Sequence, residues 1–383
     1  MSVFFIYVIP TKAGISPKGI VNTQFSVYSS FDKNQWMKVD YIIVGSGLAG
    51  ILFCEVLKHH NKTYVVYEDY SQKSSTVAGG LYNPVILKRF TKVWNAKEQL
   101  NIALSMYKTM EETLKVKLDY KMPIYRLFAS IEEQNNWFAA CDKPNLAEFL
   151  STKLVANTNT ALNGEFGFGE VVNTGRIDTK QLVLKYREQL EANNNLIKEV
   201  FNYEELVIDS GVRYNDYEAK HIVFAEGFGV AQNPFFKYLP MNPVKGELIT
   251  IHAPDLKIDF VLKSSVFLIP LEEDLYLVGA TYNWKDISNS TSKSGKQELV
   301  SKLKTIINCE FKVVKQVAGI RPTVLDRRPL VGKHPKLDNV YVLNGLGTRG
   351  VMIAPFVALE LYNFIEHNHP LNKEINISRF DKD

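Results

Sequence analysis

A strand followed directly by a glycine-rich turn constrains this chain more than any other feature. The segment DYIIVGSGLAG is an apolar run that ends in the spacing G-x-G-x-x-G, formed by Gly45, Gly47 and Gly50. The first glycine permits a tight turn, the second lets a pyrophosphate approach the backbone, and the third lets helix and strand pack closely. A helical pattern (ILFCEVLKHH) and a second strand (TYVVYE) follow. Residues 39–69 are therefore predicted to form a Rossmann-type nucleotide-binding unit.

An acidic residue lies where such a unit recognises a ribose. Glu68 ends the second strand, at about the 20-residue distance from the glycines that the motif requires. A carboxylate there accepts hydrogen bonds from a ribose diol and disfavours a 2′-phosphate. Ser46, Leu48, Ala49 and Asp69 are predicted to contact the same ligand. This unit alone does not separate NAD from FAD.

A second glycine-rich junction lies near the end of the chain. The segment VLNGLGTRGVMIAP, residues 342–355, is typical of a strand, a loop and a helix start. Bare backbone N–H groups at the positive end of a helix suit an anion or an electron-rich ring. The predicted contacts in this loop are Gly347, Thr348, Arg349, Gly350, Val351 and Met352.

The composition excludes several classes of protein. A chain of 383 residues can hold two domains, and its net charge of +4 is too small to indicate nucleic-acid binding. No apolar run approaches the roughly 18 residues of a membrane helix. The cysteines Cys54, Cys141 and Cys309 are far apart and odd in number, and the histidines lack HxxxH or HExxH spacing. We therefore expect no metal site, no disulfide framework, no membrane partner and a cytoplasmic location; nothing in the sequence specifies an oligomeric state.

The first 36 residues differ from the rest. VFFIYVI is apolar, but no basic segment precedes it and no helix-length core follows, which is a poor match to a secretory signal. Met37 opens MKVDYIIV, the short lead into the first strand. We expect folding to begin at Met37, with residues 1–36 a mis-set start or a dispensable extension; a targeting peptide is the alternative.

The middle of the chain alternates between helical and strand-rich segments. Residues 96–150 are mostly helical, and residues 165–200 predict a strand, a turn and a helix with Asp178 as N-cap. Strand patterns follow over 196–226 and in ELITI, VFLIP and LYLVGATY, before the helices KQELVSKLKTII and FVALELYNFIEH. The nucleotide-type strands thus return in pieces, separated by inserts.

Four separated motifs resemble one known family. GSGLAG with Glu68, AGGL, PLEEDLYLVGAT, and GIRP followed by GLGTRGVMIAP occur in the order found in the D-amino-acid oxidase family of FAD-dependent amine oxidoreductases, which includes glycine oxidase and sarcosine oxidase. The resemblance runs from about Met37 to the C-terminus. It implies an α/β fold in which a discontinuous Rossmann-like FAD-binding domain carries an α+β substrate domain built on an antiparallel sheet. The implied ranges are 37–95, 160–240 and 316–383 for the FAD-binding domain, and 96–159 and 241–315 for the substrate domain.

The resemblance also implies how the cofactor is held. An extended FAD needs both glycine-rich loops, one for its pyrophosphate and one for the pyrimidine edge of the flavin. Val200 matches a position whose backbone contacts adenine, and Glu226 is an unusual residue at the end of its strand. FAD should be non-covalent, because the late cysteine that attaches flavin in sarcosine oxidase-like members is absent after Cys309. Further implied contacts are Ser75, Ala78, Gly79, Gly80, Ala225 and Gly227.

On the substrate side, the resemblance singles out Arg321 in G-x-R-P. In glycine oxidase-like members this arginine grips the substrate carboxylate, and a planar guanidinium meets two oxygens at once. The alternative is a structural arginine paired with Asp326 or another acid. Phe267 stands where those enzymes have a tyrosine, and Tyr282 is a candidate polar group nearby, although both suit a core equally.

A basic pair, Lys88 and Arg89, falls in the segment after AGGL that often reaches the flavin face. Arg89 is a candidate substrate-side residue, and an exposed surface pair is the alternative reading.

The implied reaction is oxidation of the C–N bond of a small amine or amino acid. Hydride passes from the α-carbon to flavin N5 and the imine hydrolyses, with dioxygen or another acceptor reoxidising the flavin. GLGTRG also resembles the oxidase domain of the bifunctional enzyme that trims a carboxymethyl-amino group on wobble uridine in tRNA. That reaction, with tRNA as the partner, and a non-catalytic flavin-binding protein are the alternatives.

Overall fold

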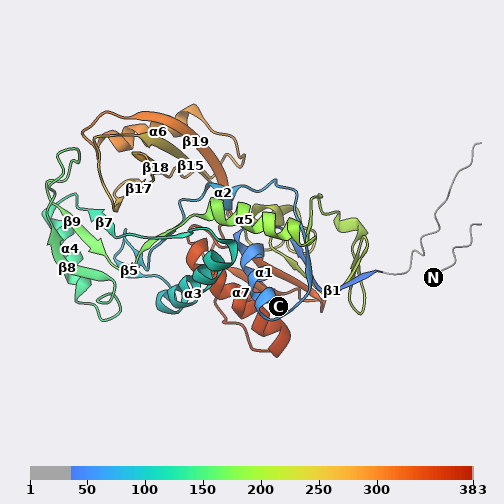
Figure 1. Ribbon diagram of the computed structural model, residues 1–383. Helices are drawn as coiled ribbons and strands as arrows, with labels where there is room; N and C mark the ends of the chain where they lie inside the picture. Colours follow the sequence, from blue (N-terminus) through green and yellow to red (C-terminus); the bar gives the residue numbers. More distant parts are fainter. Residues whose placement is uncertain (1–35, 382–383) are drawn as a thin grey trace, which may run out of the picture.

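The computed structural model describes residues 36–381, which form two large β-sheets with helices packed against them (Figure 1). Residues 1–36 were predicted to lie outside the fold. Residues 1–35 are outside the described range, so this stays a prediction. Trp36, the first described residue, packs under a guanidinium, with Arg213 Cζ 5.0 Å from the centroid of its ring.

The first sheet carries the predicted nucleotide-binding unit. Its parallel core has the order β11-β2-β1-β14-β21, and β12, β13 and β20 add antiparallel pairs. The central strands are continuous apolar runs because both faces of the sheet are buried, one under the α-helices and the other under the hairpin β12–β13, loops and 3-10 turns. The strands are β1 (Met37–Val44), β2 (Tyr64–Tyr67), β11 (Leu196–Ile197), β12 (Val207–Ile208), β13 (Val212–Tyr214), β14 (Tyr217–Phe224), β20 (Leu330–Lys333) and β21 (Val340–Asn344).

Four helices pack around this sheet and on one another. Helix α1 contacts α7 and α5, and α7 also contacts α3. The predicted N-cap of α5 is confirmed, since the Asp178 side chain accepts from the Gln181 N–H at the start of that helix. The helices are α1 (Leu48–His59), α3 (Ala96–Leu114), α5 (Thr179–Ala192) and α7 (Gly350–His367).

A proline inside α7 shows how the helix that carries the second glycine loop is held. Pro355 has no N–H, so the carbonyl of Val351, four residues earlier, lacks its intrahelical donor. The buried Tyr107 hydroxyl on α3 donates to that carbonyl at 2.9 Å. Packing of α3 therefore supplies the hydrogen bond that the α7 sequence removes, close to the helix start.

The second sheet has the order β19-β15-β18-β17-β16-β7-β9-β8. Its pairs are antiparallel except β16–β7, which is parallel, as the long connection between these two strands permits. Helices α6 (Lys293–Lys304) and α4 (Ile131–Cys141) pack against it. The strands are β7 (Ile124–Leu127), β8 (Leu150–Val155), β9 (Phe168–Val171), β15 (Val244–His252), β16 (Val261–Lys263), β17 (Phe267–Pro270), β18 (Leu275–Gly279) and β19 (Lys312–Arg321).

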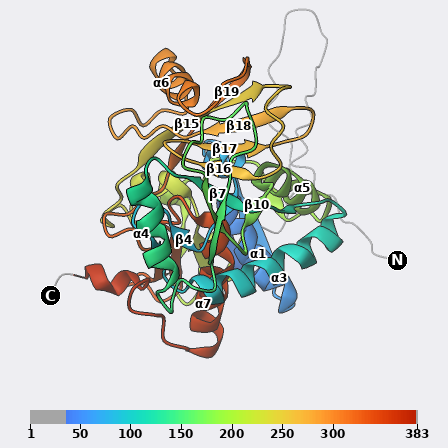
Figure 2. The ribbon, with the colours of Figure 1, turned by 90° about the vertical axis from the view of Figure 1, so that its left-hand side faces the viewer.

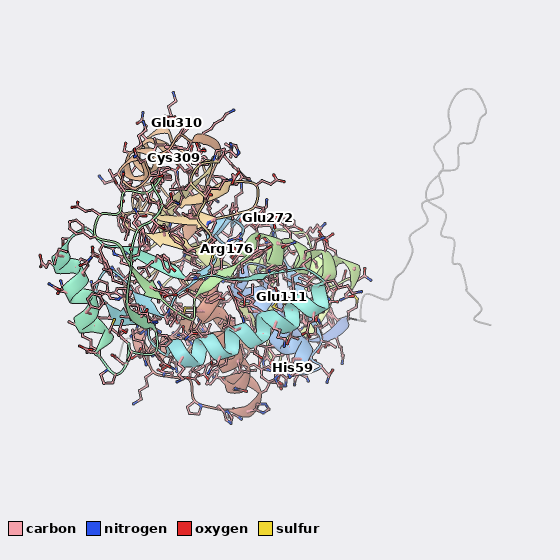
Figure 3. All side chains as sticks on the ribbon, turned by 60° about the vertical axis from the view of Figure 1, so that its left-hand side comes forward. His59, Glu111, Arg176, Glu272, Cys309 and Glu310 are labelled. Atoms are coloured by element: carbon pink, nitrogen blue, oxygen red, sulfur yellow. The ribbon has the colours of Figure 1, made fainter. Side chains whose placement is uncertain are left out.

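Short elements connect the first sheet and its helices to the second sheet and its helices, and α6 and α1 lie at opposite ends of the molecule. Figure 2 shows α6 at the end away from α1 and α7, and Figure 3 places Cys309, which follows α6, opposite His59 at the end of α1. Within residues 36–381, every helix is too short or too polar to cross a bilayer. The remaining elements are α2 (Ser74–Val77), β3 (Leu81–Tyr82), β4 (Val85–Ile86), β5 (Thr91–Lys92), β6 (Asp119–Lys121), β10 (Gly175–Ile177) and the 3-10 turns at Tyr203–Glu205, Gly227–Gln232 and Ile377–Phe380.

The predicted α/β class is confirmed, but the strand pattern over residues 196–208 is only partly realised. This stretch forms two two-residue strands around a 3-10 turn, because the Asn202 side chain accepts from the Glu204 N–H and starts that turn. The domain ranges stay a prediction. Strand β9 was assigned to the FAD-binding domain but pairs in the second sheet. Helix α3 was assigned to the substrate domain but packs on α7.

Candidate functional site

The carboxyl ends of the parallel strands bring the two glycine-rich loops together. In open α/β sheets, ligands bind beyond these ends, where loops from neighbouring strands meet. The Ala225 N–H donates to Val44 O at 2.8 Å, which joins the ends of β14 and β1. The Asn344 side chain, at the end of β21, donates to Gly227 O at 2.8 Å. The motifs at the two ends of the chain therefore share one wall.

Two of the glycines are required by close packing. Gly45 has φ +100°, and a Cβ on it would lie 2.6 Å from Ala225 O. A Cβ on Gly50 would lie 2.0 Å from Gly45 O, so α1 packs directly on the turn. Gly50 therefore serves the close approach of helix and strand that the motif predicts.

Two other glycines leave open space. A Cβ on Gly47 would meet only the Ser75 hydroxyl, at 3.3 Å, and one on Gly347 would meet nothing within 4 Å. Both lie beside helix starts, where first-turn N–H groups lack intrahelical acceptors. One of these, the Leu48 N–H, donates to Ser75 Oγ at 2.9 Å. Room for a ligand thus adjoins the positive ends of α1 and α7.

Glu68 belongs to a buried hydrogen-bond network in which one member, Arg187, was not predicted from the sequence. Its Oε2 accepts from the Ser46 N–H and hydroxyl, both at 2.6 Å, and from Arg187 Nη2 at 2.9 Å. Its Oε1 accepts from the Tyr70 N–H at 2.7 Å. The network fixes the carboxylate at the cavity wall and joins it to the first glycine loop. Ser46 acts here through Glu68, and it does not line the cavity itself.

A signal for Arg187 was present in the sequence. On α5 the buried positions include Leu182, Val183, Tyr186 and Leu190, and Arg187 falls on the same stripe. A charged residue at a buried helical position needs a partner, and a nearby carboxylate supplies it.

One cavity of about 1250 Å³ lies between the loops and the second sheet, larger than the roughly 300–1,000 Å³ of an ordinary small-ligand pocket. We call the wall made by residues 45, 47–49, 225–227 and 347–351 the loop side, and the wall made by Arg126, Lys263, Phe267 and Arg321 the sheet side. The predicted residues that line the cavity are Gly45, Gly47, Leu48, Ala49, Glu68, Asp69, Ser75, Ala78, Gly79, Gly80, Val200, Ala225, Gly227, Phe267, Tyr282, Arg321, Gly347, Thr348, Arg349, Gly350 and Val351.

Four predicted residues do not line it. Besides Ser46 and Gly50, Met352 is fully buried and its N–H donates to Arg349 O within α7. Arg89 is exposed outside the cavity, whereas the neighbouring Lys88 is exposed and lines it. Within the described residues, no group of three His, Cys, Asp or Glu side chains could hold a metal ion.

Arg321 lines the sheet side without a carboxylate partner. Its Nη1 donates to Thr281 O at 3.3 Å and its Cζ lies 4.7 Å from the centroid of the Tyr282 ring. The alternative, structural role predicted a pair between Arg321 and Asp326, but Asp326 accepts from Arg379 at 2.8 Å instead. Burial lowers the pKa of Arg321 from its ordinary value. The Asp326 alternative is therefore wrong, and the guanidinium has no acid within 4.0 Å among residues 36–381.

The two candidate aromatics differ in their surroundings. The Phe267 ring is half-buried, and a Cβ on Gly79 would lie 3.2 Å from it, so Phe267 packs beside the AGGL loop. Tyr282 is 53% exposed and Trp284 60% exposed, and their rings stack with centroids 6.0 Å apart. Phe267 packs at the edge of the main hydrophobic core, whereas Tyr282 is outside it, and both line the cavity.

An extended dinucleotide fits this cavity. Gly47 and Gly347 leave open space beside the starts of α1 and α7. Glu68 is held at the cavity wall near the first glycine loop. Val200, 74% exposed, lines the part of the cavity that also contains Glu199 and Phe201. These contacts suit a pyrophosphate, a ribose and an adenine in the order that the motifs predict.

Comparisons with known proteins agree with this geometry. The family model of the FAD dependent oxidoreductase (DAO) matches residues 40–363. The chain is 30% identical over 168 residues to glycine oxidase from Bacillus subtilis, covering 42% of this chain and 44% of that protein. It is 20% identical over 346 residues to a tRNA 5-methylaminomethyl-2-thiouridine biosynthesis bifunctional protein from Marinobacter nauticus, covering 83% of this chain and 54% of that protein.

The solved structure of glycine oxidase from Geobacillus kaustophilus shares the fold, with a TM-score of 0.73, 18% identity, and coverage of 90% of this chain and 98% of that chain. The chain spans about half the length of the curated relatives named above. The family match spans both walls of the cavity and confirms the resemblance seen in the sequence. This chain therefore belongs to the DAO family of FAD-dependent oxidoreductases, enzymes whose cofactor is FAD.

Proposed function

We propose that this chain oxidises the C–N bond of a small amine or amino acid with non-covalently bound FAD. The observation that carries the proposal is Arg321, a desolvated guanidinium that lines the cavity opposite the glycine loops and has no acid within 4.0 Å among the described residues. A buried charge is costly unless it is paired, so a ligand carboxylate is the expected partner. The likeness to glycine oxidase supports this choice.

The chain's own groups would position the substrate. Arg321 offers a planar fork for two carboxylate oxygens, and Thr281 O fixes one end of that fork. Phe267 and Gly79 present an apolar surface that excludes water from the reacting carbon. Bound FAD would supply the acceptor for the hydride that leaves this carbon, after which water hydrolyses the imine. Positioning and desolvation carry the reaction, without an acid–base side chain.

Non-covalent attachment is supported by the cavity lining. Among the residues that line it there is no cysteine and no histidine, and Cys54 and Cys141 are buried elsewhere in the core. The flavin should therefore stay in the supernatant after acid precipitation of the protein, and colour retained in the pellet would contradict this part of the proposal.

A second candidate function has a specific observation in its favour. Tyr282 and Trp284 form an exposed stacked pair beside Arg321, and such a platform suits a nucleic-acid base. A wobble uridine stacked there would present its carboxymethyl-amino group to Arg321. The likeness to the tRNA biosynthesis proteins supports this reading.

Anaerobic reduction separates the candidates. The FAD-loaded protein is mixed without oxygen with a panel of small amines and amino acids, and separately with an anticodon stem-loop that carries carboxymethylaminomethyl-uridine. Bleaching of the flavin band by small amino acids supports the proposal, and bleaching by the RNA alone favours the second function. No bleaching by either set would indicate a flavin-binding protein without this activity.

A further inference from the structure

Two basic side chains of the sheet side, Arg126 and Lys263, have no role in the function proposed above, and of these two Arg126 is paired with Glu133. Lys263 ends β16 and lines the cavity together with Arg126 and Phe267. Its Nζ lies 5.8 Å from the centroid of the Phe267 ring. Among residues 36–381 no carboxylate lies within 4.0 Å of this ammonium, and no hydrogen bond to another side chain holds it. It is an unpaired cation in the wall of a substrate cavity.

The acids near Lys263 are already used by other cations. Arg126, its partner in register on β7, is bound by Glu133, with Nη2 and Oε1 2.7 Å apart. Lys302 on α6 is paired with Glu298 at 2.6 Å. Burial lowers the pKa of Lys263 to about 8, and the charges of Arg126 and Lys302 act in the same direction. A cation in these surroundings gains most from an anion that a ligand brings.

We propose that Lys263 binds a second carboxylate of the substrate, so that the preferred substrates are amino acids with an additional carboxylate at the end remote from Arg321. The inference rests on the proposed function, because Arg321 is there the partner of the first carboxylate. It adds a specificity-determining residue, and it narrows the substrate class to dianionic amino acids.

The sheet geometry sets the spacing of the two carboxylates. Strands β19 and β16 are separated by β15, β18 and β17, so the two strands lie roughly 19 Å apart at about 4.8 Å per strand. The register places Lys263 in line with Val317, so Arg321 lies four residues further along β19. The Arg321 side chain reaches back across Gly246 on β15, and Lys263 reaches along the Phe267 ring. The remaining gap suits two anions joined by several bonds, with the apolar linker on Phe267. Glycine itself cannot bridge it.

Matched unreactive ligands test the proposal without turnover. The FAD-loaded protein is titrated with succinate, glutarate and adipate, and with butanoate, pentanoate and hexanoate, which have the same chains but one carboxylate. Dissociation constants come from the shift of the flavin absorption band and, independently, from calorimetry. We expect at least one dicarboxylate to bind tenfold or more tightly than its monocarboxylate partner.

Substitutions then locate the preference. Lys263→Met should abolish it and leave the monocarboxylate constants and the FAD content unchanged. Lys302→Met is the matched control, because it removes the same charge outside the cavity, and it should keep the preference. Lys263→Arg should also keep it, and at pH 9.5, where the wild-type ammonium has titrated, only the Lys263→Arg variant should still discriminate.

Four outcomes would overturn the inference. If monocarboxylates bind but no dicarboxylate is preferred, or if Lys263→Met keeps the preference, Lys263 is not the second anchor although the proposed function stands. If Lys263→Met weakens both ligand sets equally, the lysine acts on the shared carboxylate or amine site. If no carboxylate binds to the wild type, the Arg321 anchor fails, and the proposed function and the inference fail with it.

Discussion

The loop side and the sheet side of the cavity are built in different ways. On the loop side, the ligand surface is mainly backbone, and the charged pair behind it is satisfied, with Glu68 bound by Arg187 at 2.9 Å. On the sheet side, Arg321 and Lys263 line the cavity with no carboxylate within 4.0 Å among the described residues. Arg349 is the exception on the loop side, because it also lines the cavity with no carboxylate within 4.0 Å among the described residues. The sheet side therefore leaves two cations, and the loop side one, for a ligand to neutralise.

This difference separates the two tasks of the site. Backbone N–H groups at helix starts suit a cofactor, because the cofactor is always the same molecule and the fold can fix every one of its contacts. Unpaired side-chain charges select a variable ligand by its anions. Changes on one side should therefore leave the other side's ligand largely unaffected, and the following variants test that separation.

The largest effect is expected at Gly47. Its φ is an ordinary −74°, so a side chain there meets no backbone strain and extends into the open approach of the cavity. Gly47→Leu should abolish FAD retention, measured as the flavin-to-protein ratio after desalting, while the protein stays folded. Gly47→Ala is the control, since its Cβ meets only Ser75 Oγ at 3.3 Å, and it should retain FAD. Normal flavin content in the Leu variant would break the assignment of the loop side.

The next effect concerns the pair behind the loop side. Arg187→Met leaves Glu68 buried without its cation, and removing one partner of a buried pair costs about 3–5 kcal/mol of unfolding free energy. Glu68→Gln combined with Arg187→Met should recover part of this loss, which a double-mutant cycle by denaturant unfolding measures. Arg213→Met removes an exposed pair with Asp209, which solvent screens, and should cost far less than Arg187→Met. Equal costs for the two arginines would contradict the structural role of Arg187.

The sequence predicted the loop side better than the sheet side for a physical reason. Glycine spacing after a strand is a local pattern, and it located both loops and Glu68. Lys263 gave no comparable signal, because its lack of a partner depends on β7 and α4, where Glu133 binds Arg126. Residues 196–208 were predicted as strands because Asn202 was not recognised as the start of a turn.

Even a clear motif left some contacts open. The third glycine, Gly50, serves packing against Gly45 O, and the Met352 N–H donates within α7, so neither faces the cavity. The sequence shows which residues surround a loop, but the direction of each N–H depends on the turn that the helix start adopts.

The smallest effect is expected from pH on the loop side. Burial raises the pKa of Glu226 from 4.5 to about 7, against hydrogen bonds from Asn233 and Tyr203 that lower it. The folded protein then holds a proton that the unfolded chain releases, so this stabilisation is full below pH 4.5 and is lost as pH rises through 7. The slope from this group is at most about 1.4 kcal/mol per pH unit.

Glu226→Gln should flatten that slope between about pH 5 and 8 in unfolding free energies of the FAD-saturated protein. An unchanged slope would show that another group causes the pH dependence.

The central claim, that charge on the sheet side selects the substrate independently of the cofactor, is tested most directly by ligand titration of Arg321→Met. Charge-assisted hydrogen bonds contribute about 1.5–3 kcal/mol each, so the dissociation constant for pentanoate should rise roughly 10–1000-fold, with partial rescue in Arg321→Lys. FAD content and the affinity for pentylamine, which lacks a carboxylate, should stay near the wild-type values. Loss of FAD, or equal weakening of pentanoate and pentylamine, would contradict the account.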